Sequence, residues 1–159
     1  FRLWNGVLMR IALVFLLAFV AGLPAAADSG PSVEQAFREF GLFGTWAIDC
    51  QGPATPANPR VTIGMPTAGV VIEDHDLGAD YALNRYSVLA AQRISAERLA
   101  VDVIFQPGAP NEERQKLEFL VRDGTRRTMF NQPEGGPVRV KGGIALARGS
   151  KTPVLRKCE

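Results

Sequence analysis

From Gly44 onwards the sequence is a series of short strand-like segments, and turn-forming residues separate each segment from the next. Valine, isoleucine, threonine and aromatic residues are frequent in the segments, whereas Gly, Pro, Asp and Asn gather at the breaks. The strongest turn signal is Asp123-Gly124, which separates two alternating segments. No stretch between segments has the length and period of a crossover helix, which parallel strands would need. The sequence therefore predicts a meander of antiparallel strands.

The predicted fold class is all-β, with about eight strands that close into a small barrel. A two-sheet sandwich is the alternative; we favour the barrel because the segments lack the prolines and inward charges that protect exposed sheet edges. The tail, residues 152–159, is either a final strand or a helical turn. The expected strands cover 44–50, 60–65, 69–73, 84–94, 98–105, 113–122, 126–131, 138–141 and 144–148.

A short helix is expected ahead of the first strand, over residues 32–40. Ser32 can cap the helix, Gln35 is placed as its capping-box partner, and Gly41 can end it. Apolar residues recur on one face of this helix, which would lie across the core. These residues are Val33, Ala36, Phe37 and Phe40.

Residues 1–27 have the pattern of a cleavable export signal. Arg10 precedes the apolar run 11–23, and small residues at 25–27 form a cleavage site. Because the run is shorter than the roughly 20 residues of a membrane-spanning helix, we favour a cleaved signal over a retained anchor. Met9 is a conventional start, which would make residues 1–8 an upstream extension. We expect a single periplasmic or secreted domain over 28–159, with no other membrane attachment.

The chain contains two cysteines, Cys50 and Cys158, and no Cys-x-x-Cys motif. In an oxidising compartment an isolated pair of cysteines predicts a disulfide, although two free thiols are the alternative. The bond would close a loop of more than 100 residues. Such a loop corresponds to about 4–5 kcal/mol of stability in the chain-entropy treatment of disulfides.

Basic residues are concentrated in the last quarter of the chain, although the whole chain has a net charge of only +2. Loss of Arg2 and Arg10 with the export signal would leave no net charge, so nucleic acid is not an expected partner. The C-terminal basic residues either pair with acidic neighbours across strands, which we favour, or form a face for an anionic partner. The candidate face contains Arg126, Arg127, Arg139, Lys141 and Arg156.

The segment Gly44-Thr45-Trp46, just after a short helix, resembles the Gly-x-Trp opening of lipocalins and related small barrels. The Trp-x-x-Asp-Cys segment and the C-terminal Cys are also similar to those of uncharacterised secreted bacterial proteins. The lipocalin resemblance implies that Trp46 packs at the closed end of the barrel, under a basic residue near the last strand. Arg156 and Lys157 are the candidates. If Cys50 and Cys158 were directly opposite on paired antiparallel strands, however, the partner position of Trp46 would lie beyond the last residue, Glu159. Arg156 would then not cover Trp46.

The only histidine, His75, lies in the acidic stretch 74–80. Asp74, Asp76 and Asp80 weakly resemble a calcium loop, but their spacing does not match the twelve-residue pattern. We therefore expect a solvated connection between strands, and no metal or other cofactor. With one histidine and two cysteines expected to be bonded, no nucleophile–base set is indicated.

The sequence favours a non-enzymatic, lipocalin-like binding protein with a small apolar ligand or an envelope protein as its partner. The ligand-carrier version of this hypothesis requires a cavity of about 300 Å³ or more inside the barrel, and the absence of one would contradict that version. The alternative is a protein–protein interaction module, such as a secreted protease inhibitor or an envelope-associated structural protein, for which a filled interior is expected.

Overall fold

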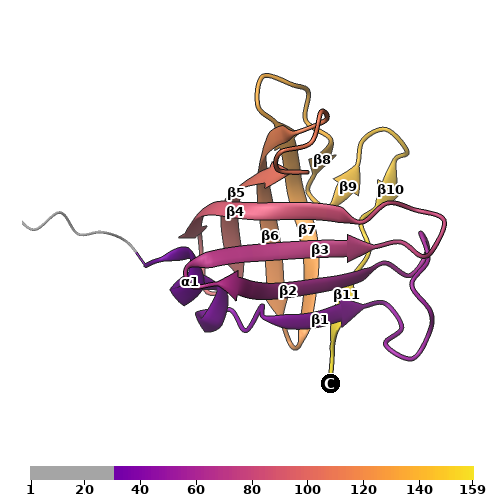
Figure 1. Ribbon diagram of the computed structural model, residues 1–159, viewed down its shortest axis with the longest axis horizontal. Coiled ribbons are helices and arrows are strands. Elements are labelled where there is room, and N and C mark those ends of the chain that lie inside the picture. Colours follow the sequence, from indigo (N-terminus) through magenta and orange to yellow (C-terminus); the bar gives the residue numbers. More distant parts are fainter. Residues whose placement is uncertain (1–30) are drawn as a thin grey trace, which may run out of the picture.

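The computed structural model describes residues 31–159, so the expected export signal over 1–27 lies outside the described residues. The described chain forms one short helix, α1 (Val33–Glu39), followed by strands (Figure 1). The strands are β1 (Gly44–Ala47), β2 (Arg60–Thr67), β3 (Val70–Asp76), β4 (Asn84–Arg93), β5 (Arg98–Phe105), β6 (Glu113–Arg122), β7 (Thr125–Pro133), β8 (Val140–Lys141), β9 (Ile144–Ala145), β10 (Ser150–Lys151) and β11 (Leu155–Cys158).

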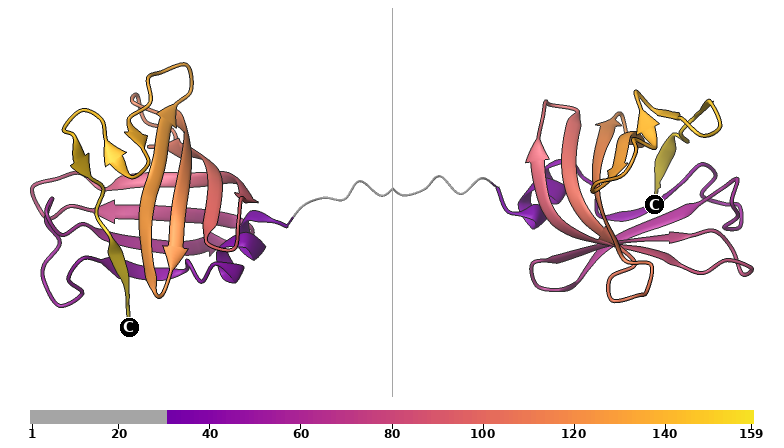
Figure 2. Two further views of the ribbon diagram at one scale, coloured as in Figure 1. Left: turned by 180° about the vertical axis from the view of Figure 1, so that it is seen from behind. Right: turned by 90° about the horizontal axis from the view of Figure 1, so that it is seen from above.

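Eight of these strands form a closed antiparallel barrel. The ring runs β1, β2, β3, β4, β5, β6, β7 and β11, and β11 pairs with β1 again. Seen from behind, β6 and β7 cross the direction of β1–β3, as the two walls of a twisted barrel do (Figure 2). The predicted barrel is confirmed and the sandwich alternative is wrong. The tail is a strand, β11, and not a helical turn.

A small antiparallel extension, β8–β10, is attached to the barrel through β7. The first part of β7 pairs with β11, whereas Phe130 and Asn131 further along pair with β8. Strands β9 and β10 continue outwards from β8 (Figure 1). The extension therefore lies at the end of the barrel where β7 finishes, opposite the end that carries α1.

Several strand boundaries differ from those expected: β4 ends one residue earlier, β7 is longer, β8 and β9 are shorter, and β10 is an additional strand. Strand β1 ends at Ala47, because Trp46 and Ala47 are both buried and the alternation fails at Ile48, which is 39% exposed. Strand β2 continues through Pro66 to Thr67. Strand β3 continues to Asp76, so the prediction of a solvated loop over 74–80 is wrong for its first half. Pairing with β2 and β4 on both sides outweighs the acidic composition there.

Helix α1 covers the closed end of the barrel. The Ser32 hydroxyl accepts a hydrogen bond from the Gln35 backbone N–H at 3.1 Å, as a helix cap should. The Gln35 side chain bonds to Glu39 and does not complete the expected capping box. Ala36 and Phe37 are buried against the barrel. The apolar face predicted for this helix is therefore the face that closes the core.

Trp46 fills the core beneath α1, where its indole N–H donates to the Leu42 carbonyl at 2.8 Å. Lys157 is its partner in the β1–β11 register, and the Lys157 ammonium lies 5.7 Å from the centre of the indole ring. The same ammonium donates to the Gly41 carbonyl at 2.8 Å. At Gly44 the backbone φ is +115°, a value that favours glycine. The basic residue over Trp46 is thus Lys157, whereas Arg156 pairs with Ala47.

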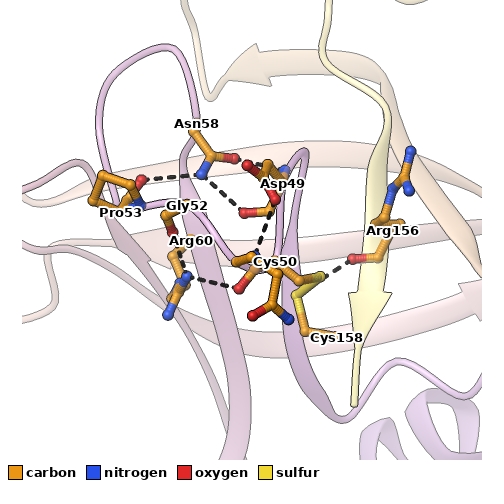
Figure 3. Close-up of a disulfide and its surroundings, with 9 residues drawn as sticks. Asp49, Cys50, Gly52, Pro53, Asn58, Arg60, Arg156 and Cys158 are labelled. Atoms are coloured by element: carbon orange, nitrogen blue, oxygen red, sulfur yellow. Dashed lines mark hydrogen bonds between the residues drawn. A yellow bond between two sulfur atoms is a disulfide. The ribbon is translucent and has the colours of Figure 1, made fainter.

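The predicted disulfide joins Cys50 to Cys158, with 5.5 Å between their Cα atoms (Figure 3). Cys50 lies in a bend after β1, and the residue directly opposite Cys158 is Thr45. The two cysteines are therefore not directly opposite, and the register that follows from that assumption does not apply. The Asn58 side chain accepts from the Asp49 N–H at 2.9 Å, and the Arg60 guanidinium donates to the Cys50 carbonyl at 3.2 Å. These bonds hold the bend at the β1–β11 seam.

The disulfide indicates an oxidising, non-cytoplasmic compartment. Among residues 31–159, no helix combines the length and the apolar character that a membrane crossing requires.

Replacement of Cys50 tests the contribution of the disulfide. We expect Cys50→Ser to lower stability by about 4 kcal/mol, because the reduced unfolded chain regains the freedom of a long loop. Thermal unfolding in oxidising buffer should show a melting temperature lower by roughly 10–15 °C. With reductant added, wild type and variant should melt together; equal melting in oxidising buffer would contradict the prediction.

Candidate ligand-binding site

A cavity of about 240 Å³ lies inside the open end of the barrel, opposite α1. Its volume is below the roughly 300–1,000 Å³ of pockets for drug-sized ligands, so the size that the sequence-based hypothesis requires of a ligand carrier is not reached, and only a smaller ligand would fit. Five apolar side chains form its wall: Val88, Val101, Val103, Leu117 and Phe119. The other lining residues are Glu73, His75, Tyr86, Thr128, Asn131, Val140, Thr152 and Pro153.

Strand alternation places most of these side chains in the barrel, and a β-bulge places one of them. In β6–β7, Phe119 pairs with Thr128 but Glu118 pairs with Phe130, so Met129 is an extra residue in β7. An extra residue reverses which positions face inwards. As a result Thr128 and Asn131, three positions apart, both line the cavity.

A buried ion pair connects two walls of the barrel. Arg126 of β7 donates from Nη2 to Glu73 Oε1 of β3 at 2.7 Å, and the two residues are only 3% and 5% exposed. The Arg126 guanidinium also lies 4.3 Å from the centre of the Phe119 ring. The assignment of Arg126 to a basic surface face is therefore wrong. Its charge is inside the barrel, where a paired carboxylate offsets it.

His75 lies next to this pair, facing the cavity. Its Nε2 is 2.6 Å from Glu73 Oε1, the oxygen that also accepts from Arg126. An ionised carboxylate only accepts hydrogen bonds, so His75 Nε2 carries the hydrogen. The imidazole packs against Tyr86, with 4.9 Å between ring centres. His75 is therefore part of the barrel interior and not of a solvated connection.

The buried pair determines the ionisation of two neighbouring groups. Burial alone would raise the pKa of Glu73, but the Arg126 charge and the hydrogen bond from His75 lower that pKa to about 2. Burial and the Glu73 carboxylate raise the pKa of Tyr86 to about 12. At neutral pH the cavity wall therefore presents an ionised carboxylate and a protonated phenol.

The other four residues of the candidate basic face differ from one another in their contacts and exposure. Arg139 forms a two-point ion pair with Glu113, at 2.7 and 2.8 Å. Arg127 donates to Thr152 Oγ1 at 3.0 Å and to the Gly143 carbonyl. Lys141 and Arg156 are exposed on β8 and β11. Pairing with acidic neighbours, the interpretation that we favour from the sequence, is found at Arg126 and Arg139.

The three aspartates of the possible calcium loop do not converge. Asp74 forms a two-point ion pair with Arg85, with both distances 2.8 Å. Asp76 accepts from the Gly78 backbone N–H at 2.8 Å, and Asp80 is exposed in the following turn. In the described part of the chain, no three or more His, Cys, Asp or Glu side chains are grouped so as to hold a metal ion.

The sequence-based analysis does not identify the polar groups of the cavity. A period of two through Val71, Glu73 and His75 is a signal that could place the last two on the core-facing side of a strand. Tyr86 has a similar signal, two positions before Val88. Asn131 has no such signal, because the bulge at Met129 changes its face.

The arrangement is suited to holding a small molecule, with an apolar wall that excludes water and a few fixed polar groups that orient the ligand. No family model matches the sequence, and no curated protein or solved structure matches it either. Inferences about function therefore depend on the geometry of this site.

Removal of one partner of the buried ion pair should lower the stability of the protein more than removal of both partners. We expect Glu73→Leu to lower the free energy of unfolding by about 3–5 kcal/mol at pH 7, because it leaves the Arg126 charge buried and unpaired. The double variant Glu73→Leu/Arg126→Met should regain most of that loss. Urea unfolding measures both; a double variant no more stable than Glu73→Leu would contradict the prediction.

The same pair should make stability depend on pH. The pKa of Glu73 is lowered on folding from 4.5 to about 2, so its stabilisation is complete above pH 4.5 and is lost as pH falls towards 2. The expected loss is on the order of 3 kcal/mol. Unfolding curves at pH 5, 4, 3 and 2 should show a steeper decline for wild type than for Glu73→Leu/Arg126→Met. Parallel declines would contradict the prediction.

Proposed function

We propose that this protein is a non-enzymatic binding protein of the periplasm or the extracellular medium, and that its barrel holds a small, largely apolar ligand. The observation that carries the proposal is the cavity at the open end, where an apolar wall surrounds a few convergent polar side chains. The disulfide and the expected export signal support the compartment.

The size of the cavity limits the ligand. An engineered cavity of about 150 Å³ in another protein binds benzene, and the present cavity is about 240 Å³. It therefore has room for one ring system with a short substituent. A long acyl chain or a drug-sized molecule would extend past Val140, Thr152 and Pro153 at the mouth. The proposed ligand is accordingly smaller than the one expected from the sequence.

The polar groups of the cavity support binding over catalysis. Arg126 holds Glu73 in its ionised form, so Glu73 has no proton to donate near neutral pH. His75 Nε2 is engaged by Glu73, and both cysteines are bonded to each other. These groups are arranged as fixed hydrogen-bonding partners.

Features of the closed end support a lipocalin-like arrangement. Gly44-Thr45-Trp46 opens the first strand, Trp46 packs beneath α1, and Lys157 from the last strand lies over the indole. The alternative from the sequence, an interaction module with a filled interior, is less well supported, because the open end contains a cavity.

A substitution that fills the entrance of the cavity tests the proposal. Val140 lines the cavity mouth, whereas its neighbour Lys141 is exposed. We expect a panel of small neutral aromatic compounds (toluene, phenol and indole) to raise the melting temperature of wild type, and Val140→Trp to abolish this effect by filling the entrance. Lys141→Trp is the matched control and should respond as wild type does.

Isotope-edited NMR spectra would confirm the location, since binding should shift the signals of Val101 and Val103. If no compound of the panel binds wild type, or if Val140→Trp and Lys141→Trp bind equally well, the proposed function is wrong.

A further inference from the structure

Basic residues are concentrated in the β8–β10 extension without acidic residues to balance them. The stretch 135–158, which contains the extension, has no aspartate or glutamate. The basic residues of the extension itself are Arg139, Lys141, Arg148 and Lys151. Arg139 is paired with Glu113, whereas the other three are exposed and form no ion pair with any described residue. The extension therefore presents uncompensated positive charge to its surroundings.

The strand register places two of these lysines on the same face of the extension. Lys141 of β8 and Lys151 of β10 are both directly opposite Ile144 of β9, which lies between them. Residues directly opposite one another in a sheet point to the same face. The two lysines are therefore about 10 Å apart, which is two strand spacings. The row continues through Phe130 of β7, which is opposite Lys141.

The face that carries the lysines is directed away from the cavity. Val140 is opposite Asn131, and both line the cavity. Successive side chains of a strand point to opposite faces, so Lys141 and its row lie on the outer side. The β9–β10 turn adds two exposed residues, Leu146 and Arg148, at the end of this row, where β9 and β10 stand outside the ring of the barrel (Figure 1). We call these five residues the extension surface: Lys141, Ile144, Leu146, Arg148 and Lys151.

Two other places in the sheet show charges that are paired across strands. Asp74 of β3 is directly opposite Arg85 of β4 and forms a two-point ion pair with it. Arg98 of β5 pairs with Glu118 of β6 at 2.6 Å. A row with two lysines and no carboxylate lacks this cross-strand stabilisation. An anionic partner outside the molecule would supply it.

The apolar side chains beside the cations indicate what kind of anion fits. Leu146 is 51% exposed, and Val154, which follows β10, is 52% exposed. Cations together with exposed aliphatic side chains are typical of surfaces that lie on a lipid bilayer, where the cations meet the head groups and the apolar groups enter the acyl boundary. A polyanion in solution would leave the aliphatic groups in water. The extension surface therefore fits anionic lipid better than a free anionic polymer.

We propose that the extension surface docks on an anionic phospholipid bilayer. Val140, the neighbour of Lys141, lines the mouth of the cavity, so docking brings this mouth close to the lipid. The inference goes beyond the proposed function and does not depend on what the cavity binds. It also departs from the sequence-based expectation that only the export signal attaches the protein to a membrane.

Sedimentation with vesicles tests the inference on wild type. We expect binding to vesicles of phosphatidylcholine and phosphatidylglycerol in equal amounts, and roughly 10-fold weaker binding, or none, to phosphatidylcholine alone. Roughly 0.5 M NaCl should release the protein, because salt screens exposed charges. Equal binding to the two kinds of vesicle, or no binding to either, would overturn the inference, and the melting-temperature shifts produced by cavity ligands would stand in both cases.

Variants connect vesicle binding to the extension surface. Lys141→Gln/Lys151→Gln should weaken binding to the mixed vesicles roughly 25-fold, about 5-fold for each lysine. The matched control is Arg122→Gln/Arg156→Gln, because these exposed arginines are both opposite Thr125, at the other end of β7. The control should change binding less than about 2-fold, since this end would face away from the bilayer. Equal effects of the two double variants would overturn the docking surface.

A second variant keeps the inference testable if the lysine variant fails to fold. Arg148→Gln, in the exposed β9–β10 turn, should then weaken vesicle binding about 5-fold, and unchanged binding would overturn the inference.

A soluble polyanion distinguishes docking on lipid from attraction to any anion. Leu146→Ser keeps every charge, so it should weaken binding to the mixed vesicles roughly 3- to 5-fold and leave binding to heparin unchanged. If heparin binds wild type as tightly as the mixed vesicles do, and Leu146→Ser alters neither, the partner is a polyanion in solution and the lipid proposal is wrong.

Discussion

Closure of the sheet between β1 and β11 is the constraint on which the rest of the structure depends. Both strands are only four residues long, and three residue pairs join them. Such a short seam gains support from contacts outside the ladder. Lys157 reaches over Trp46 to the Gly41 carbonyl, and the disulfide joins the bend after β1 to the end of β11. The seam is therefore stabilised by a cation on an aromatic ring and by a covalent bond, as well as by backbone pairing.

The shortness of β11 also produces the open end. Since β11 pairs only with the first residues of β7, the remainder of β7 is free to pair with β8. Val140 of β8 and Thr152, beyond β10, then form part of the cavity mouth. Between the mouth and the Trp46 core, the Glu73–Arg126 pair spans the barrel from β3 to β7. The interior is thus divided into a filled apolar end and a partly hollow end with polar groups.

The sequence predicts the architecture well because the architecture depends on local patterns. Turn residues, alternation and the absence of crossover helices predict the antiparallel barrel, and the cysteine pair and the cap at Ser32 are found as expected. Boundaries fail where tertiary pairing outweighs composition. Acidic residues at 74–76 suggest a loop, yet two neighbouring strands pair with them. Cys50 is assigned to a strand that in fact ends at Ala47, where two successive residues are buried.

The site is harder to predict because its properties come from groups far apart in the sequence. Arg126 has the same composition signal as the exposed basic residues around it, and only the barrel closure brings it to Glu73, 53 positions earlier. The orientation of Asn131 depends on Gln115, on Glu113 and finally on Arg139, which follows β7. A bulge at Met129 then decides that Asn131 faces inwards. Residue types alone indicate neither the face nor the donor–acceptor direction. The chemistry of this cavity is therefore a property of strand register, and a one-residue change in register would replace the side chains at its wall.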